Sequence, residues 1–178
     1  VDYLMESGIK SDNAAFAEIE QIVAEKNIKK VLTQRGTRVV LGNGAVLDIL
    51  FPDRDVAGMD TNDASIIAKL VYGKNSFLFT GDSPQKMEKY LVSLDGKNLD
   101  SDVLKVGHHG SKTSSSESFL GYVSPEYAII SAGKDNRYNH PHQEILDRLT
   151  QFGAKILRTD ETGTIEIKTD GENILFAN

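Results

Sequence analysis

The chain has 178 residues, enough for one hydrophobic core, and its 39% apolar and 26% charged residues are typical of a globular protein. Its formal net charge of −6 argues against a broad nonspecific nucleic-acid surface, which needs clustered lysine and arginine. No apolar stretch reaches the roughly 18 residues of a membrane-spanning helix, so we predict no transmembrane segment in this chain.

The first part of the chain predicts a strand, a helix and a β-hairpin. An apolar segment at residues 1–5 precedes a helix that Ser11 or Asp12 can cap. Asn43-Gly44 separates two β-rich runs and predicts a two-residue hairpin turn, because both residues tolerate positive φ. The helix is expected to carry one apolar face, formed by Phe16, Ile19, Ile22 and Val23.

The rest of the chain alternates strands and helices. A second hairpin is predicted within residues 65–80, with Gly73-Lys74-Asn75 as its turn. Pro84 is expected to begin one helix and Gly153 to end another. The other expected elements are strands at 102–106, 127–131, 155–159, 163–169 and 173–177 and helices at 115–123 and 141–152. Hairpins interleaved with strand–helix–strand units predict an α/β fold with antiparallel and parallel pairing.

Three loops that each follow an apolar strand carry the candidate functional groups. Asp82 follows the first strand, His108 and His109 the second, and His140 and His142 the third. Because the carboxyl ends of strands in α/β folds meet at one rim, these side chains are expected to gather there as a metal or acid–base site. Cysteine is absent, so any metal must be held by His, Asp, Glu or water. The alternative is that Asp82 only caps the following helix and the histidines are solvated or structural.

Four segments resemble, in order and spacing, the C-terminal metallo-β-lactamase-like domain of ComEC-type competence proteins. The resemblance covers roughly residues 36–172, and the sequences HHGS and NHPH are its most specific parts. It implies that residues 1–178 are one domain, the C-terminal portion of an αββα sandwich with mixed sheets that lacks its N-terminal strands. The matching segments are residues 62–84, 99–116, 127–149 and 157–167.

The resemblance also implies a site with two divalent metal ions, zinc or manganese, in the complete domain. Asp82 would bridge the two ions, and His109 is favoured over His108 as the other ligand. His108 would then stabilise charge on a phosphoryl oxygen, and His140 would contact the substrate phosphate or donate a proton. The alternative for His140 is a structural hydrogen bond that pins its loop. His142 is assigned no catalytic role.

Further residues are predicted to support this site. Three of them could bind substrate phosphate: Lys105, Ser111 and Ser114. Asn62 and Ser65 stand where the subfamily carries N-x-x-S, which implies a structural or second-shell pair. The alternatives are that Ser115 or Ser116 caps the helix that follows and that Lys105 extends along the surface to solvent.

One departure limits the resemblance. The first metal motif of the superfamily, H-x-H-x-D-H, is missing: His140 and His142 have the H-x-H spacing, but Glu144 and Ile145 follow where the motif has Asp and His. The sequence is therefore expected to begin just downstream of that motif, as a fragment or as a natural degenerate member, and the start at Val1 favours the fragment. Self-association or a second chain supplying the missing half is then expected, because uncovered sheet edges tend to pair. The chain alone should bind metal weakly and be inactive.

The expected function is that of a metal-dependent hydrolase, a phosphodiesterase or nuclease of the DNA-uptake type, with DNA or another phosphodiester as substrate. As part of a membrane-anchored competence protein it would lie outside the cytoplasm; otherwise its location is open. Two alternatives remain: a catalytically inactive binding or interaction domain, and a free-standing hydrolase of another ester. Both remain because fold does not fix substrate.

Overall fold

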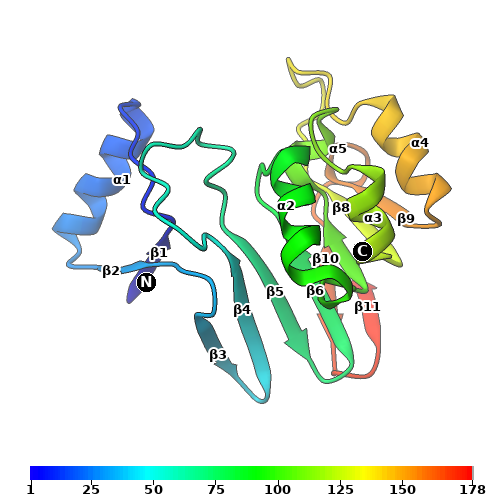
Figure 1. Ribbon diagram of the computed structural model, residues 1–178, viewed down its shortest axis with the longest axis horizontal. Helices are drawn as coiled ribbons and strands as arrows, with labels where there is room; N and C mark the ends of the chain where they lie inside the picture. Colours follow the sequence, from blue (N-terminus) through cyan, green and yellow to red (C-terminus); the bar gives the residue numbers. More distant parts are fainter. Residues whose placement is uncertain (178) are drawn as a thin grey trace.

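The computed structural model describes residues 1–177 and contains a seven-stranded mixed sheet (Figure 1). Strands β3 to β6 pair antiparallel, and β6 to β9 pair parallel. The strand order follows the chain: β3 (Arg38–Gly42), β4 (Ala45–Phe51), β5 (Ile67–Tyr72), β6 (Asn75–Phe79), β7 (Val103–Lys105), β8 (Tyr127–Ile130) and β9 (Lys155–Arg158). The expectation of both pairing types is confirmed.

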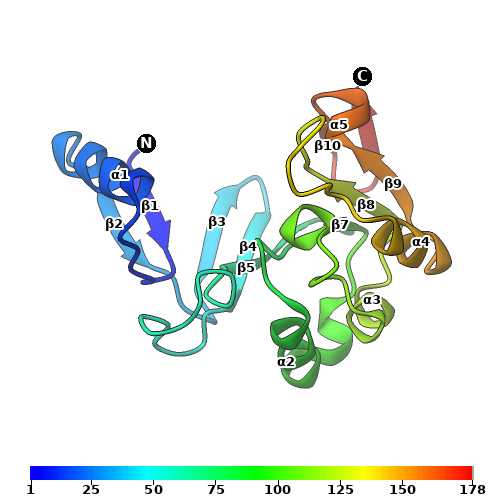
Figure 2. The same ribbon diagram turned by 90° about the horizontal axis from the view of Figure 1, so that it is seen from above.

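Helices cover one face of the sheet and a β-hairpin covers the other (Figure 2). The helical layer consists of α2 (Gln85–Asp95), α3 (Glu117–Val123) and α4 (Gln143–Gln151), with a 3₁₀ turn, η1 (Gly96–Leu99), after α2. On this face the core contains the fully buried side chains Leu78, Leu104, Ile130, Leu91, Leu120 and Leu149. Burial of six such leucine and isoleucine side chains stabilises the layer by about 2 kcal/mol each.

The opposite face of the sheet packs against β10 (Glu166–Thr169) and β11 (Ile174–Ala177), which form an antiparallel pair. Their apolar side chains meet Phe77, Val103 and Ile129 of the sheet. A short helix, α5 (Thr159–Thr162), links β9 to this hairpin. Alternate residues of β6 and β7 therefore point into two different cores, as expected for a sheet buried on both faces.

The N-terminal segment lies beside β3 and β4, at the far end of the molecule from β9 (Figure 1). It contains two parallel strands, β1 (Tyr3–Glu6) and β2 (Lys29–Leu32), joined by α1 (Ala14–Glu25). The predicted apolar face of α1 is covered only in part. Val23 is buried, whereas Ile19 and Ile22 are 48% and 40% exposed.

The turns and caps agree with the sequence in part. The Asn43-Gly44 hairpin is confirmed, with φ of 50° and 87°. The second hairpin turn is shorter than predicted, because Asn75 already pairs with Tyr72 and only Gly73-Lys74 remain as its turn. The prediction for the cap of α1 was wrong: Asn13, not Ser11 or Asp12, accepts the Phe16 N–H at 2.7 Å. No helix within residues 1–177 is long and apolar enough to cross a bilayer.

The cap of α1 gives a first test. Asn13→Ala should destabilise α1 by about 1 kcal/mol, because the Phe16 N–H loses its acceptor at the first turn of the helix. Faster exchange of the Phe16 amide hydrogen, followed by NMR, would report this loss. Asp12→Ala is the control and should leave the exchange rate unchanged. Equal effects of the two substitutions would contradict the assignment.

Candidate metal and acid–base site

Three loops at the carboxyl ends of β6, β7 and β8 bring the predicted residues together. Parallel register places Phe79, Lys105 and Ile129 in one row, so the loops that follow open on the same rim. His109 Nε2 lies 3.6 Å from Asp82 Oδ1. The ring of His140 lies 5.6 Å from that of His108 and 6.5 Å from that of His109, between centroids.

The imidazole of His109 is held in one orientation by the backbone. Its Nδ1 lies 2.6 Å from the carbonyl oxygen of Ser131, and a carbonyl can only accept, so Nδ1 carries a proton. In the neutral ring Nε2 then carries a lone pair and is an acceptor, and it lies opposite a carboxylate oxygen of Asp82. A positive charge between these two acceptors, either a proton on the ring or a metal ion, would make the contact favourable.

The distance between these two atoms fits two ligands of one metal ion. Tetrahedral ligands at zinc distances lie about 3.3–3.4 Å from each other, close to the separation found here. A metal-binding histidine commonly donates its other ring N–H to a carbonyl, as His109 does to Ser131. Both side chains are accessible, with 49% of His109 and 42% of Asp82 exposed. Within residues 1–177, however, no three His, Cys, Asp or Glu side chains are grouped so that they could hold an ion.

The backbone at the two histidines is strained. They lie in a 3₁₀ turn, η2 (Gly107–Gly110), where His108 has φ 48° and His109 has φ 56°. The left-handed region costs non-glycine residues about 1–2 kcal/mol each. Such strain persists only where surrounding contacts enforce it, and it concentrates at functional sites.

Gly110 joins the two histidine loops. Its φ is +81°, and a Cβ at this position would lie 2.5 Å from Pro141 Cβ. Its carbonyl accepts the His142 N–H at 3.0 Å, so the loop after β7 and the loop after β8 are linked through the backbone. The glycine of HHGS therefore allows His109 and His140 to share one rim.

The serine-rich loop has a structural role for most of its hydroxyl groups. Ser114 is completely buried and its hydroxyl donates to the carbonyls of Gly107 and Ser111. Ser111 is only 5% exposed and its hydroxyl contacts Thr113. The substrate-binding roles of Ser111 and Ser114 stay predictions; in this structure both residues are buried and their hydroxyls are bonded within the protein. Thr113, which the sequence reading missed, contacts His108 Nδ1 at 3.2 Å.

Glu88 of α2 holds this loop in place. Its carboxylate is 1% exposed and accepts the N–H groups of Ser115 and Ser116, at 2.5 and 2.7 Å. Burial raises the pKa of Glu88, against the lowering effect of these two backbone donors and of Arg148. The expected capping by a serine hydroxyl is thus corrected. Ser116 is the N-cap of α3, but a carboxylate from α2 satisfies the backbone donors.

The other predicted residues lie near Asp82. The Ser65 hydroxyl accepts the Asp82 N–H at 3.1 Å, so Ser65 positions the loop that carries this carboxylate. Asn62 contributes its backbone carbonyl to Ser65 N–H. Lys105 is half-buried and its ammonium donates to the Val106 carbonyl at 3.3 Å. Burial lowers the pKa of Lys105, and the charge of Asp82 opposes this effect.

The loop of residues 133–140 is organised by Asn136. Its side-chain carbonyl accepts the N–H groups of Tyr138 and His140, and its amide donates to the carbonyls of Gly133 and His140. Burial and the three neighbouring imidazoles lower the pKa of His140, while Asp82 raises it. A cavity of about 370 Å³ opens beside this loop, lined by His109, Ser131, Ala132, Gly133, Asn136, Tyr138 and His140.

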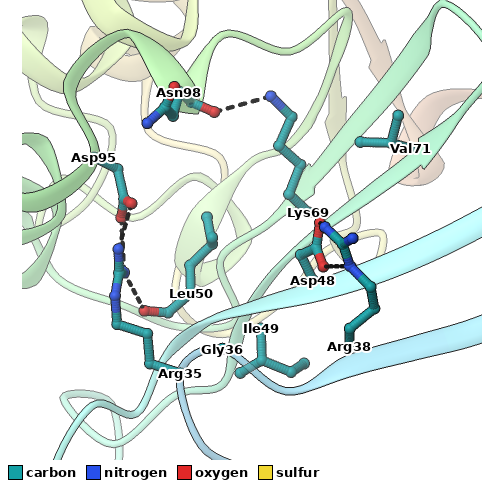
Figure 3. A pocket seen from close by; sticks show the side chains of 10 residues that line it. All are labelled: Arg35, Gly36, Arg38, Asp48, Ile49, Leu50, Lys69, Val71, Asp95 and Asn98. Carbon is teal, nitrogen blue, oxygen red and sulfur yellow. Dashed lines mark hydrogen bonds and ion pairs between the residues drawn. The ribbon is translucent and has the colours of Figure 1, made fainter.

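A second cavity, of about 470 Å³, lies near the end of α2 (Figure 3). Its cations are satisfied internally. Arg35 pairs with Asp95 and donates to the Leu50 carbonyl, and Arg38 pairs with Asp48. Lys69 donates to the carbonyls of Asn98 and Asp100. Within the described residues, each of these cations is therefore paired with a carboxylate or bonded to backbone carbonyls.

Comparison with known proteins relates the chain to bacterial competence proteins. It is 44% identical over 107 residues to ComE operon protein 3 of Bacillus subtilis, a match that covers 60% of the chain and 14% of that protein. It is 46% identical over 108 residues to competence protein ComA of Neisseria gonorrhoeae, covering 61% and 16%. This chain is a homologue of the ComEC-type competence proteins. Recombination protein 2 of Haemophilus influenzae is 40% identical over 124 residues, covering 70% of the chain and 15% of that protein.

The chain thus spans about one seventh of the length of these ComEC-type relatives. No protein-family model matches the chain. Its fold is similar to that of a putative metal-dependent hydrolase from Parabacteroides distasonis, with a TM-score of 0.51 at 12% identity, covering 89% of the chain and 76% of that structure. The structure of the CmlA β-hydroxylase E377D mutant gives a TM-score of 0.53 at 12% identity, covering 89% of the chain and 43% of that structure. The metallo-β-lactamase-like fold class is confirmed.

Gly110 provides a test of the coupling between the histidine loops. Gly110→Ala should destabilise the protein by about 1–3 kcal/mol more than Gly153→Ala, because its Cβ also collides with Pro141. Gly153 is the matched control: its φ is +80°, and nothing lies within 4 Å of the added Cβ. Urea unfolding measures both. Equal losses of unfolding free energy in the two variants would show that Pro141 moves away from the added methyl group without cost.

Glu88 provides a test of the loop support. Glu88→Gln leaves one acceptor oxygen for two buried N–H groups, so it should cost about 1–3 kcal/mol of unfolding free energy. The NMR signals of His108 should also shift, because Thr113 lies in the loop that Glu88 holds. Glu117→Gln, on the exposed first turn of α3, is the control and should change stability by less than about 0.5 kcal/mol. A loss no larger than that of the control would contradict the role of Glu88.

Proposed function

We propose that this chain carries part of the active site of a metal-dependent phosphodiesterase that acts in DNA uptake. The observation that carries the proposal is the 3.6 Å distance between His109 Nε2 and Asp82 Oδ1, which fits two ligands of one metal ion. The homology to ComEC-type competence proteins supports the connection with DNA uptake. In a membrane-anchored protein of this type the domain would lie outside the cytoplasm.

Asp82 and His109 would hold a divalent ion, zinc or manganese. An ion of this kind lowers the pKa of a bound water and neutralises charge that develops on phosphate oxygens. The complete domain would bind two ions bridged by Asp82. The remaining ligands would come from polypeptide outside residues 1–178, or from a second copy of the chain.

His108 and His140 would act on the substrate. The centroids of the two rings lie 5.6 Å apart, and the His140 ring lies 6.5 Å from that of His109. Thr113 contacts Nδ1 of His108, which leaves Nε2 for a phosphoryl oxygen. The lowered pKa of His140 keeps its ring neutral near pH 7, and an incoming phosphate anion would raise that pKa and favour proton uptake. His140 could then donate this proton to the leaving oxygen.

Lys105 would contribute positive charge beside Asp82 rather than a direct contact. Its ammonium is turned to the Val106 carbonyl, and its pKa is lowered by burial. Ser65 and Asn62 would not touch the metal or the substrate but would hold the backbone of the loop that bears Asp82.

A second candidate function is binding without catalysis. It is favoured by the small donor set, since only Asp82 and His109 converge within the described residues. In that case the rim would bind a phosphodiester through His108 and His140 and release it unchanged. Hydrolysis of another ester by the same groups is a further outcome of the test below.

The test uses the protein at its full gene-encoded length with Mn²⁺ or Zn²⁺ and a single-stranded oligonucleotide. His140→Ala should lower turnover by about 10²–10⁴-fold, the range for loss of a general acid or base, with metal content and melting temperature unchanged. Asp135→Asn, in the same exposed loop, is the control and should keep full turnover. Loss of metal from His140→Ala would make His140 a ligand, and loss of folding would make it structural.

Metal binding can be measured on the 178-residue chain itself. Isothermal titration with Mn²⁺ and Zn²⁺ should show weak binding, because two protein ligands leave most of the coordination shell to water. Asp82→Asn and His109→Ala should each reduce this affinity by at least the roughly 10–100-fold that loss of an outer-shell partner costs. Affinity unchanged in both variants would place the ion elsewhere. Oligonucleotide cleavage by the wild-type chain alone would show that the two ligands suffice.

A further inference from the structure

The loop that presents His140 also presents an aromatic ring and a cation to solvent. Tyr138 is 57% exposed, although tyrosine rings in folded proteins usually bury most of their surface. Its ring lies at 24° to that of His140, with 5.6 Å between centroids. A flat, accessible surface thus extends outward from a candidate catalytic histidine.

Arg137 lies over the Tyr138 ring, with its guanidinium carbon 4.7 Å from the ring centroid. Its guanidinium also donates to the Tyr138 hydroxyl. Other arginines of the chain have carboxylate partners: Arg35, Arg38, Arg54 and Arg158. Within residues 1–177, the contacts of the Arg137 guanidinium are with Tyr138. The guanidinium of Arg137 can therefore bind a phosphate without first breaking an ion pair.

The backbone that bears these two side chains is fixed before any ligand binds. Asn136 uses its side-chain carbonyl and amide to bind four backbone groups of this loop. The cavity of about 370 Å³ is lined by both Tyr138 and His140. Two aromatic rings at the edge of a recess suit a flat heteroaromatic group better than they suit a sugar or a phosphate.

We propose that Tyr138 is a stacking platform for an unpaired nucleobase and that Arg137, which lies over the ring in this structure, moves off it to bind a phosphate next to that base. This inference rests on the proposed function and deepens it, because it names single-stranded nucleic acid as the substrate class. Bases in a duplex are already stacked and cannot lie on Tyr138. Stacking on an aromatic side chain tolerates any base, and the arginine fixes the backbone without reading sequence.

The position of the platform relates it to the rim. A base on Tyr138 places its own phosphate near His140, whose ring stacks on the same tyrosine. The platform would therefore set which phosphodiester lies over Asp82 and His109. It would also supply affinity that a chain of net charge −6 cannot obtain from a basic surface.

The experiment measures binding of three 5′-labelled octamers to the 178-residue chain in EDTA, by fluorescence anisotropy. The probes are octathymidylate, the same octamer in duplex form, and an octamer of abasic deoxyribose phosphates. Wild type should bind octathymidylate about 5–100-fold more tightly than the other two, the range expected for one stacked base. Tyr138→Ala should reduce octathymidylate binding to the abasic level and leave the melting temperature unchanged, and Tyr138→Phe should bind like wild type.

Two further variants separate the contributions. Arg137→Gln should weaken the binding of octathymidylate and of the abasic octamer by the same factor, because both octamers carry phosphates. Tyr122→Ala is the matched control: this tyrosine of α3 is 42% exposed, lies away from the rim, and its loss should change nothing. Equal wild-type affinity for the base-containing and abasic single strands would overturn the proposal. A Tyr138→Ala variant that loses the same affinity for both single strands would overturn it as well.

Turnover measured on the full-length protein tests the phosphodiesterase proposal separately from the stacking proposal. The base-specific effect of Tyr138 in EDTA supports the platform whether or not any metal-dependent cleavage is found. Absence of cleavage with that effect present would remove the phosphodiesterase proposal and leave a single-strand binding site. Cleavage with a KM that Tyr138→Ala does not change would remove the platform and leave the phosphodiesterase.

Discussion

The hydrogen bond between His109 Nδ1 and the Ser131 carbonyl, at 2.6 Å, determines the chemistry of the rim. It connects the loop after β7 to the end of β8, so the imidazole is oriented by two neighbouring strands of the sheet. With Nδ1 committed to a carbonyl, the lone pair of Nε2 faces Asp82. These two groups are the donors that a metal ion would meet at the rim of a chain that has no cysteine and four histidines.

Contacts on the helical side of the sheet maintain this arrangement. Gly110 permits the loop of His109 to touch Pro141, and Glu88 holds the serine-rich loop through two backbone N–H groups. The strained backbone of His108 and His109 lies between these two supports. The energy stored in that backbone is small compared with the core beneath it, where Leu78, Leu104 and Ile130 are completely buried.

The sequence predicted the gathering of Asp82, His108, His109 and His140 because each follows an apolar strand, and parallel neighbours in an α/β sheet share one rim. It predicted the fold class for the same reason and through the family resemblance. It did not predict Glu88 or Asn136. These side chains bind backbone groups, one of them far along the chain, and such contacts leave no periodic pattern. It also did not predict the burial of Ser111 and Ser114, because hydroxyl-rich loops look alike whether their hydroxyls face solvent or the protein interior.

The change from antiparallel to parallel pairing at β6 has a consequence for folding. The hairpins β3–β4 and β5–β6 close over two-residue turns and can form early, because their contacts are local in sequence. Strands β7, β8 and β9 pair only after the intervening crossovers with α2, α3 and α4 have closed, which is slower. Each rim loop belongs to one of those crossovers. The rim is therefore among the last parts to assemble, and in a growing polypeptide the histidines would be scattered until β8 docks.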